Sequence, residues 1–178
     1  MEPSLLIASP QMKDAFFERA VVLLWHHDQN GAIGVVINRA MEHSIVDILQ
    51  IPSEVDTSIY IDEAVSWGGP VETQSGTVIA QTEIDPEEGW NLPTGLCITR
   101  SQEALEQLLI HGHKIVVCLG YAGWGPGQLD QELEAGGWLW TDLDPAIVFE
   151  TPIDKRYDRA LANLGLTSQT VWMTPINE

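Results

Sequence analysis

The chain has 178 residues, 44% hydrophobic and 19% charged, with 26 acidic residues against 8 basic ones and a formal net charge of −18. This composition is typical of a globular protein, and the length predicts a single domain over residues 1–178. The charge argues against direct nucleic-acid binding and against contact with an anionic membrane, because both depend on basic side chains that neutralise phosphates.

The N-terminus and the two cysteines indicate a compartment. The chain starts Met1-Glu2-Pro3, without the basic and apolar regions of a secretory signal. No apolar run approaches the ~20 residues that span a bilayer. Cys97 and Cys118 each lie in an apolar, strand-like run, which is typical of buried reduced thiols. We therefore expect a cytoplasmic protein.

Apolar runs predict strands in the first part of the chain. Residues 4–8 form a first strand. Residues 20–25 and 32–37 are apolar on both sides of Asn30-Gly31, which predicts a β-hairpin. Because both runs are continuously apolar, this hairpin should be central and covered on both faces.

The middle of the chain alternates short elements with turns. Ser44 is suited to cap a short helix. Residues 68–71, Gly-Gly-Pro-Val, predict a glycine turn, and residues 76–81 predict a strand. Residues 84–93 are acidic and contain two prolines, so we expect a mobile loop there.

Two strands and a helix precede the most distinctive stretch. Residues 95–99 predict a strand, Ser101 caps an amphipathic helix that ends near Gly112, and residues 115–119 predict a buried strand. A loop with four glycines should follow from Gly120.

The last part of the chain returns to helices and short strands. A helix is expected over residues 127–135, ending at Gly136-Gly137. Residues 138–140 and 147–149 predict short strands, and residues 154–164 predict a helix. Strands outnumber helices and hairpin signals dominate, so the sequence predicts an α+β fold with a mostly antiparallel or mixed sheet.

Motifs for known chemistry are weak. The glycine loop lacks the Gly-Lys-Ser/Thr ending of a phosphate-binding loop, so a structural turn is the preferred interpretation. The pairs His26-His27 and His111/His113 lack the spacing of a helical zinc motif, and we predict no metal and no cofactor. No Gly-x-Ser-x-Gly occurs, and no catalytic residue is assigned.

Tryptophans flank both glycine segments. If the segments meet in space, they form an aromatic wall beside open backbone N–H groups, which is either a ligand cleft or, as we prefer, an interlocked corner of the core. The candidate ligand-binding residues are Trp67, Gly68, Gly69, Pro70, Gly120, Tyr121, Gly123, Trp124, Gly125, Gly127 and Gln128.

Several blocks of the sequence together resemble the YqgE/AlgH family of bacterial, cytosolic proteins. The blocks are residues 6–10, 31–39, 68–71, 119–133 and 138–139, in the family's order. The resemblance covers essentially the whole chain and implies a compact α+β domain with a bent, pseudo-barrel sheet and flanking helices. Some members carry a transcriptional-regulator label, but the family offers no catalytic residues to transfer.

The function expected from the sequence is therefore a non-enzymatic binding module that regulates indirectly, through an unknown protein partner or a small molecule. The alternative is a small hydrolase or nucleotide-binding enzyme that uses the same cleft. A direct DNA-binding regulator ranks last, because no basic helix-turn-helix is present and the net charge is −18.

Overall fold

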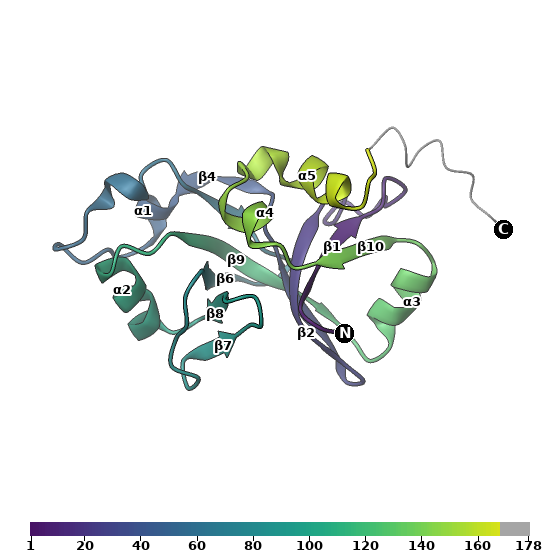
Figure 1. Ribbon diagram of the computed structural model, residues 1–178, viewed down its shortest axis with the longest axis horizontal. Helices are drawn as coiled ribbons and strands as arrows, with labels where there is room; N and C mark the ends of the chain where they lie inside the picture. The colour runs from purple at the N-terminus through teal and green to yellow at the C-terminus, as the bar shows by residue number, and fades with distance from the viewer. Residues whose placement is uncertain (168–178) are drawn as a thin grey trace.

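The computed structural model describes residues 1–167, which form a ten-stranded sheet with helices around it (Figure 1). The strands are β1 (Ser4–Ala8), β2 (Val21–Asp28), β3 (Gly31–Val36), β4 (Ala40–Ser44), β5 (Ala64–Trp67), β6 (Val71–Ala80), β7 (Gly89–Asn91), β8 (Cys97–Thr99), β9 (Ile115–Trp124) and β10 (Trp138–Asp142). The α-helices are α1 (Ile45–Ile48), α2 (Gln102–Ile110), α3 (Gln128–Glu134), α4 (Pro145–Phe149) and α5 (Arg156–Asn163), and the 3-10 helices are η1 (Thr57–Ile59) and η2 (Ile153–Lys155).

The sheet is curled into a half-barrel. Its strand order is β10-β1-β2-β3-β9-β6-β8-β7, and β4 and β5 branch from β9. Strands β5 and β9 run parallel, and the other pairings within residues 1–167 are antiparallel. The predicted α+β fold, with a mostly antiparallel, bent sheet and flanking helices, is confirmed.

Helices cover different parts of the sheet. One apolar cluster joins β1, β2 and β3 to α4 and α5, which lie at the top of Figure 1. A second lies on the opposite face of these strands and includes β10 and α3, at the right. A third packs α1 and α2 against β6 and β9, at the left. Strand β9 contributes to all three clusters, so it is the centre of the packing.

The central hairpin forms as predicted. Strands β2 and β3 pair in antiparallel register from Val22 and Val36 to Asp28 and Gly31, with a β-bulge near Trp25. Gly31 adopts φ of 138° at the turn, a value that glycine tolerates best. The first five residues of β2 are buried, which agrees with a strand covered on both faces.

Helix α5 illustrates how local sequence sets an element. Its buried residues Tyr157, Ala160 and Leu161 are spaced to share one helix face. The N–H of Gly165 bonds to Ala162 and that of Leu166 bonds to Leu161, so the helix ends at the predicted glycine in a Schellman motif.

Residues 84–93, residues 147–149 and strand β4 differ from the sequence-based prediction. Residues 147–149 belong to α4 rather than to a strand, because the Asp144 side chain accepts a hydrogen bond from the N–H of Ala146 and Pro145 occupies the first helical turn. The segment over residues 84–93 contains β7, which pairs with β8. Strand β4 was not predicted, because its residues are polar and mostly exposed.

Candidate functional site

The two glycine segments meet, which the sequence left open. The N–H of Gly68 donates to the carbonyl oxygen of Leu119 at 2.6 Å, and Val71 pairs with Tyr121 across β6 and β9. Residues 120–124 are therefore the end of strand β9, and the predicted loop from Gly120 was wrong in this part. The backbone N–H and C=O groups of β9 bond to neighbouring strands, because the curled sheet brings β3, β5 and β6 against β9.

Gly68, Gly69 and Gly120, which we call the closed corner, are glycines because backbones touch there. A Cβ atom on Gly69 would lie 2.1 Å from the carbonyl oxygen of Tyr121. One on Gly120 would lie 2.3 Å from the carbonyl oxygen of Gly69, and one on Gly68 would lie 2.3 Å from that of Gly120. Side chains cannot fit between these strands, so the closed corner serves strand packing. Pro70 follows it at an exposed position.

Gly123, Gly125 and Gly127, which we call the open segment, are not in such contact. A Cβ atom on Gly123 would come no closer than 3.7 Å to the Tyr121 ring, and one on Gly125 no closer than 3.9 Å to Gln128. Nothing lies within 4 Å of the corresponding position at Gly127, whose φ is 72° where α3 begins.

The aromatic wall divides between the two faces of β9. Tyr121 packs with the cluster beneath α4 and α5, whereas Trp124 belongs to the cluster beneath α3. Phe17 contacts Trp67, Trp124 and Trp138, with ring centroids 6.3, 6.3 and 5.8 Å away. Trp67 and Trp124 thus form part of an interlocked aromatic core, which is the arrangement that we preferred from the sequence.

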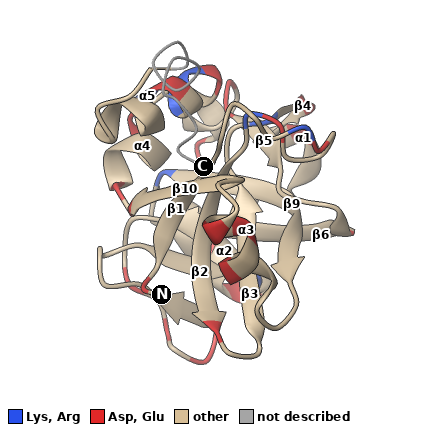
Figure 2. Cartoon of the chain, turned by 90° about the vertical axis from the view of Figure 1, so that its right-hand side faces the viewer, with Lys and Arg blue, Asp and Glu red and all other residues tan. Residues whose placement is uncertain are grey.

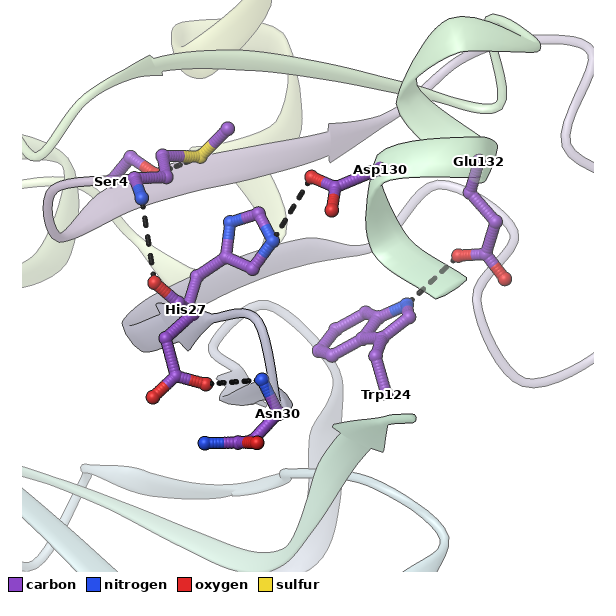
Figure 3. Close-up of polar contacts among 8 residues, drawn as sticks. Ser4, His27, Asn30, Trp124, Asp130 and Glu132 are labelled. Carbon is purple, nitrogen blue, oxygen red and sulfur yellow. Dashed lines mark hydrogen bonds and ion pairs between the residues drawn. The ribbon is translucent and has the colours of Figure 1, made fainter. Parts of the chain in front are cut away.

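Glu132 organises this aromatic core, and sequence reasoning missed it. Its Oε2 atom accepts hydrogen bonds from the indole N–H of Trp124 at 2.8 Å and of Trp138 at 3.0 Å (the Trp124 bond is drawn in Figure 3). From the sequence, Glu132 was assigned no role. The sequence does show Glu132 between Trp124, eight residues before it, and Trp138, six residues after it. That these three side chains come into contact depends on the packing of α3.

Gln128 closes the start of α3. Its Oε1 atom accepts from the N–H of Gly125 at 3.0 Å, and its Nε2 atom donates to Glu132 at 3.2 Å. The predicted helix over residues 127–135 is confirmed as α3. The polar atoms of Gln128 and Trp124 are consequently engaged within the protein.

A groove remains open beside Tyr121. It has a volume of about 370 Å³, and we call it the Tyr121 groove. It is lined by His26, Asp28, Asn30, Gly31, Ala32, Ile33, Tyr121, Gly123 and Trp124. Three of the sequence-predicted residues therefore line one groove together with the tip of the β2–β3 hairpin, which the sequence had not linked to the glycine stretch.

Polar pairs fix the tip of the hairpin. The carboxylate of Asp28 accepts from the N–H of Asn30 at 2.7 Å and lies 3.1 Å from Nε2 of His26. The bond from Asn30, followed by the charge of His26, lowers the pKa of Asp28 below its usual value. His27 points the other way, with Nε2 3.1 Å from Asp130 on α3 (Figure 3).

Residues 1–167 contain no cluster of metal-ligating side chains, and their two thiols are buried. No three His, Cys, Asp or Glu side chains in this range come together as metal ligands. Cys97 and Cys118 are buried and unpaired, as expected. Burial raises the pKa of Cys118 to about 12, so its thiol is neutral and a poor nucleophile near pH 7.

Comparison with known proteins identifies the family. The model of the AlgH-like family (DUF179) matches residues 5–169. The chain belongs to the AlgH-like family. Among AlgH-like relatives, a UPF0301 protein of Acidovorax sp. (strain JS42) is 39% identical, with 94% of this chain and 89% of the relative covered. One from Variovorax paradoxus is also 39% identical, with 90% and 87% covered.

Solved structures agree with this assignment. The solution structure of the AlgH protein from Pseudomonas aeruginosa has a TM-score of 0.75 at 31% identity, and the match covers 99% of this chain and 95% of that one. The crystal structure of protein DIP2367 from Corynebacterium diphtheriae, at 23% identity, shares the fold with a TM-score of 0.75 and covers 91% and 86%. The resemblance to the YqgE/AlgH family is therefore confirmed.

The charges on this AlgH-like domain are unevenly placed. Figure 2 shows acidic residues on α3 and at the β2–β3 tip, and both basic and acidic residues around α5. Within residues 1–167, no helix has the length and apolar character needed to cross a membrane.

Proposed function

We propose that the protein is a non-enzymatic binding module of the bacterial cytoplasm that holds a protein partner or a small molecule in the Tyr121 groove and regulates indirectly. The observation that carries the proposal is the groove itself. Its volume of about 370 Å³ lies within the range of ~300–1,000 Å³ found for ligand sites. Tyr121 and Trp124 offer apolar surface, and Asp28 and Asn30 offer polar groups beside it.

The lining favours binding over catalysis. His26 and Asp28 form an acid–base pair, but no Ser, Thr, Cys or Lys is among the residues that line the groove. A serine, threonine or cysteine hydrolase needs such a nucleophile beside its base. The two thiols lie elsewhere, buried in the core. Unpaired buried thiols also agree with a reducing compartment.

Charge favours a basic partner over nucleic acid. The net charge is −18, and the groove is lined by the carboxylate of Asp28 and, within residues 1–167, by no Lys or Arg. Opposite charge on a partner speeds its association, whereas a phosphate backbone is repelled. We expect no DNA complex in a gel-shift assay at 50 mM to 200 mM salt, a range over which true phosphate contacts weaken strongly.

A groove-filling variant tests the proposal. Gly123→Gln adds a side chain where a Cβ atom meets only the Tyr121 ring at 3.7 Å, so the fold should persist. Gly76→Gln is the matched control, because nothing lies within 4 Å of that position and Gly76 is outside the groove. Small molecules and cationic peptides are screened by thermal shift and by amide NMR.

Ligands of the wild type should perturb the amides of Tyr121 and Gly123, bind the Gly76→Gln variant equally, and lose about tenfold in affinity for Gly123→Gln. Ligands that perturb the amide resonances of other residues, or that bind Gly123→Gln as tightly as the wild type, would contradict the proposed groove. Turnover of a nucleotide or ester by the wild type that Gly123→Gln abolishes would favour the enzyme instead.

A further inference from the structure

A smaller pocket adjoins the Tyr121 groove. Its volume is about 90 Å³, and we call it the Trp25 pocket. It is lined by Trp25, Ile33, Thr77, Trp90, Arg100 and Tyr121. Ile33 and Tyr121 line both hollows, so a ligand in the groove can place one group in the pocket.

Trp25, which lines the pocket, carries a buried hydrogen-bond donor without an acceptor. Trp25 is 8% exposed, and its Nε1 atom is buried with no partner. Most buried donors in proteins are paired, and an unpaired one costs free energy that an incoming acceptor would recover. A ligand that offers an acceptor would therefore satisfy the indole N–H of Trp25.

Arg100, the cationic residue of the pocket, is held by an ion pair with Glu72, whose backbone has an unusual conformation. Glu72 has φ of 46°, which is uncommon for a residue other than glycine and is often found at functional sites. Its carboxylate accepts from Arg100 at 2.8 Å, and the Arg100 guanidinium lies 5.5 Å from the centroid of the Tyr121 ring. This pair places a guanidinium at the pocket and already neutralises its charge.

Size and charge define the occupant. A volume of about 90 Å³ is smaller than the ~150 Å³ apolar cavity that admits benzene, so the occupant is a short or branched aliphatic group. The lining is aromatic and aliphatic apart from Thr77 and Arg100. Because Arg100 is neutralised and the net charge is −18, the acceptor should be neutral.

Trp90 packs beside Trp25 at the pocket. Its ring lies 5.7 Å from that of Trp25, at an angle of 49°. Trp90 is 46% exposed and belongs to β7, a three-residue strand at the edge of the sheet. Since Nε1 of Trp25 is buried, an acceptor bonds to it only if a neighbouring side chain moves, and the half-exposed Trp90 has solvent to move into.

We propose that the Trp25 pocket binds a small aliphatic group that carries a neutral carbonyl or amide acceptor, as an anchor residue of a basic peptide does. Trp25 donates to the acceptor, and the groove beside it, with the carboxylate of Asp28, takes the cationic flanking residues. This inference deepens the proposed function and rests on it for the identity of the partner.

A small probe tests the pocket separately from the groove. The full chain, labelled with ¹⁵N, is titrated with isobutyramide and, in parallel, with isobutyrate. Isobutyramide should shift the Trp25 indole N–H resonance downfield in a saturable manner, and isobutyrate should bind more weakly. The shift should persist in Gly123→Gln, because Gly123 lines the groove and is not among the residues that line the pocket. An unmoved Trp25 resonance, or tighter binding of isobutyrate, would overturn the inference.

Peptide selection tests the partner. A random peptide library displayed on phage and selected on the wild type should yield an aliphatic residue flanked by Lys or Arg. Selected peptides should bind Trp25→Phe roughly fivefold more weakly, the loss expected for one neutral hydrogen bond, and should bind Trp140→Phe unchanged. Trp140 is 52% exposed on β10, so it controls for the loss of an indole.

Acidic consensus peptides, or equal affinity for a folded Trp25→Phe, would overturn the assignment. The thermal midpoints of both variants establish that they fold. If selected peptides lose affinity for Trp25→Phe but not for Gly123→Gln, the result supports the proposal for the pocket and contradicts the proposal for the groove. If they lose affinity only for Gly123→Gln, the result supports the proposal for the groove and contradicts the proposal for the pocket.

Discussion

The closed corner and the open segment use the same residue type for opposite purposes. In the closed corner, Cβ atoms on Gly68, Gly69 and Gly120 would lie within 2.3 Å of backbone oxygens. In the open segment, the nearest heavy atom to such a Cβ is 3.7 Å away. Absence of a side chain brings strands together in the first case and leaves a surface accessible in the second. A glycine's neighbours, rather than its sequence context, decide which role it has.

The largest expected effect comes from alanine in the closed corner. Gly69→Ala should lower the free energy of unfolding by about 3 kcal/mol or more, because its Cβ would overlap the Tyr121 carbonyl group and force β6 away from β9. Urea denaturation followed by circular dichroism measures the change. Gly76→Ala is the control, with an expected change within about 0.5 kcal/mol. Equal stability of the two variants would remove the distinction between the two regions.

The next largest effect on stability is expected at Glu132, which binds Trp124 beside the open segment. Glu132→Ala leaves the indole N–H groups of Trp124 and Trp138 without their acceptor, so it should cost about 2 kcal/mol. Glu134→Ala, on the same helix and exposed, should change stability by less than about 0.5 kcal/mol. Chemical denaturation monitored by tryptophan fluorescence compares the two. A silent Glu132→Ala would show that the aromatic core does not need the carboxylate.

The closed corner should also show a dependence on alkaline pH. A Cβ atom on Gly68 would lie 3.0 Å from Cys118, whose pKa is raised to about 12 by burial. The unfolded thiol has a pKa of about 8.5, so its stabilising contribution is complete below that pH and is lost as the pH rises toward 12. Between these values, wild-type stability should fall by about 1.4 kcal/mol per pH unit more steeply than that of Cys118→Ala.

Urea titrations at pH 8, 9 and 10 provide the measurement for the thiol. Burial also raises the pKa of Tyr60 and Tyr157, but these groups are common to both proteins and cancel in the comparison. Parallel stability curves for the wild type and Cys118→Ala would mean that Cys118 does not couple folding to pH.

The smallest effect separates backbone strain from charge at Glu72. Glu72→Gly and Glu72→Ala both remove the ion pair with Arg100, which is partly exposed and is worth at most about 1 kcal/mol. Glycine accepts φ of 46° without strain, so Glu72→Gly should be more stable than Glu72→Ala by about 1 kcal/mol. Thermal unfolding resolves this difference. Equal midpoints would indicate that the backbone relaxes when the carboxylate is lost.

Elements with strong local signals were predictable. The β2–β3 hairpin followed from Asn30-Gly31 between apolar runs, and α5 followed from helical spacing closed by Gly165. Residues 147–149 were misassigned because three apolar residues do not distinguish a strand from a helix, and the preceding Asp144-Pro145 was overlooked. The continuation of β9 through Gly120 was missed because glycines usually indicate turns.

The amino-acid sequence was sufficient to predict the α+β fold, the family, the acidic charge and the tryptophans that flank both glycine segments along the chain, since these depend on composition and on neighbours in sequence. Only the three-dimensional packing revealed that the two glycine segments meet, which glycines pack and which stay open, that Glu132 binds two indoles, and that Trp25 and Arg100 line one pocket. These relations join residues from different strands and helices. They depend on the curl of the sheet, which no short stretch of sequence encodes.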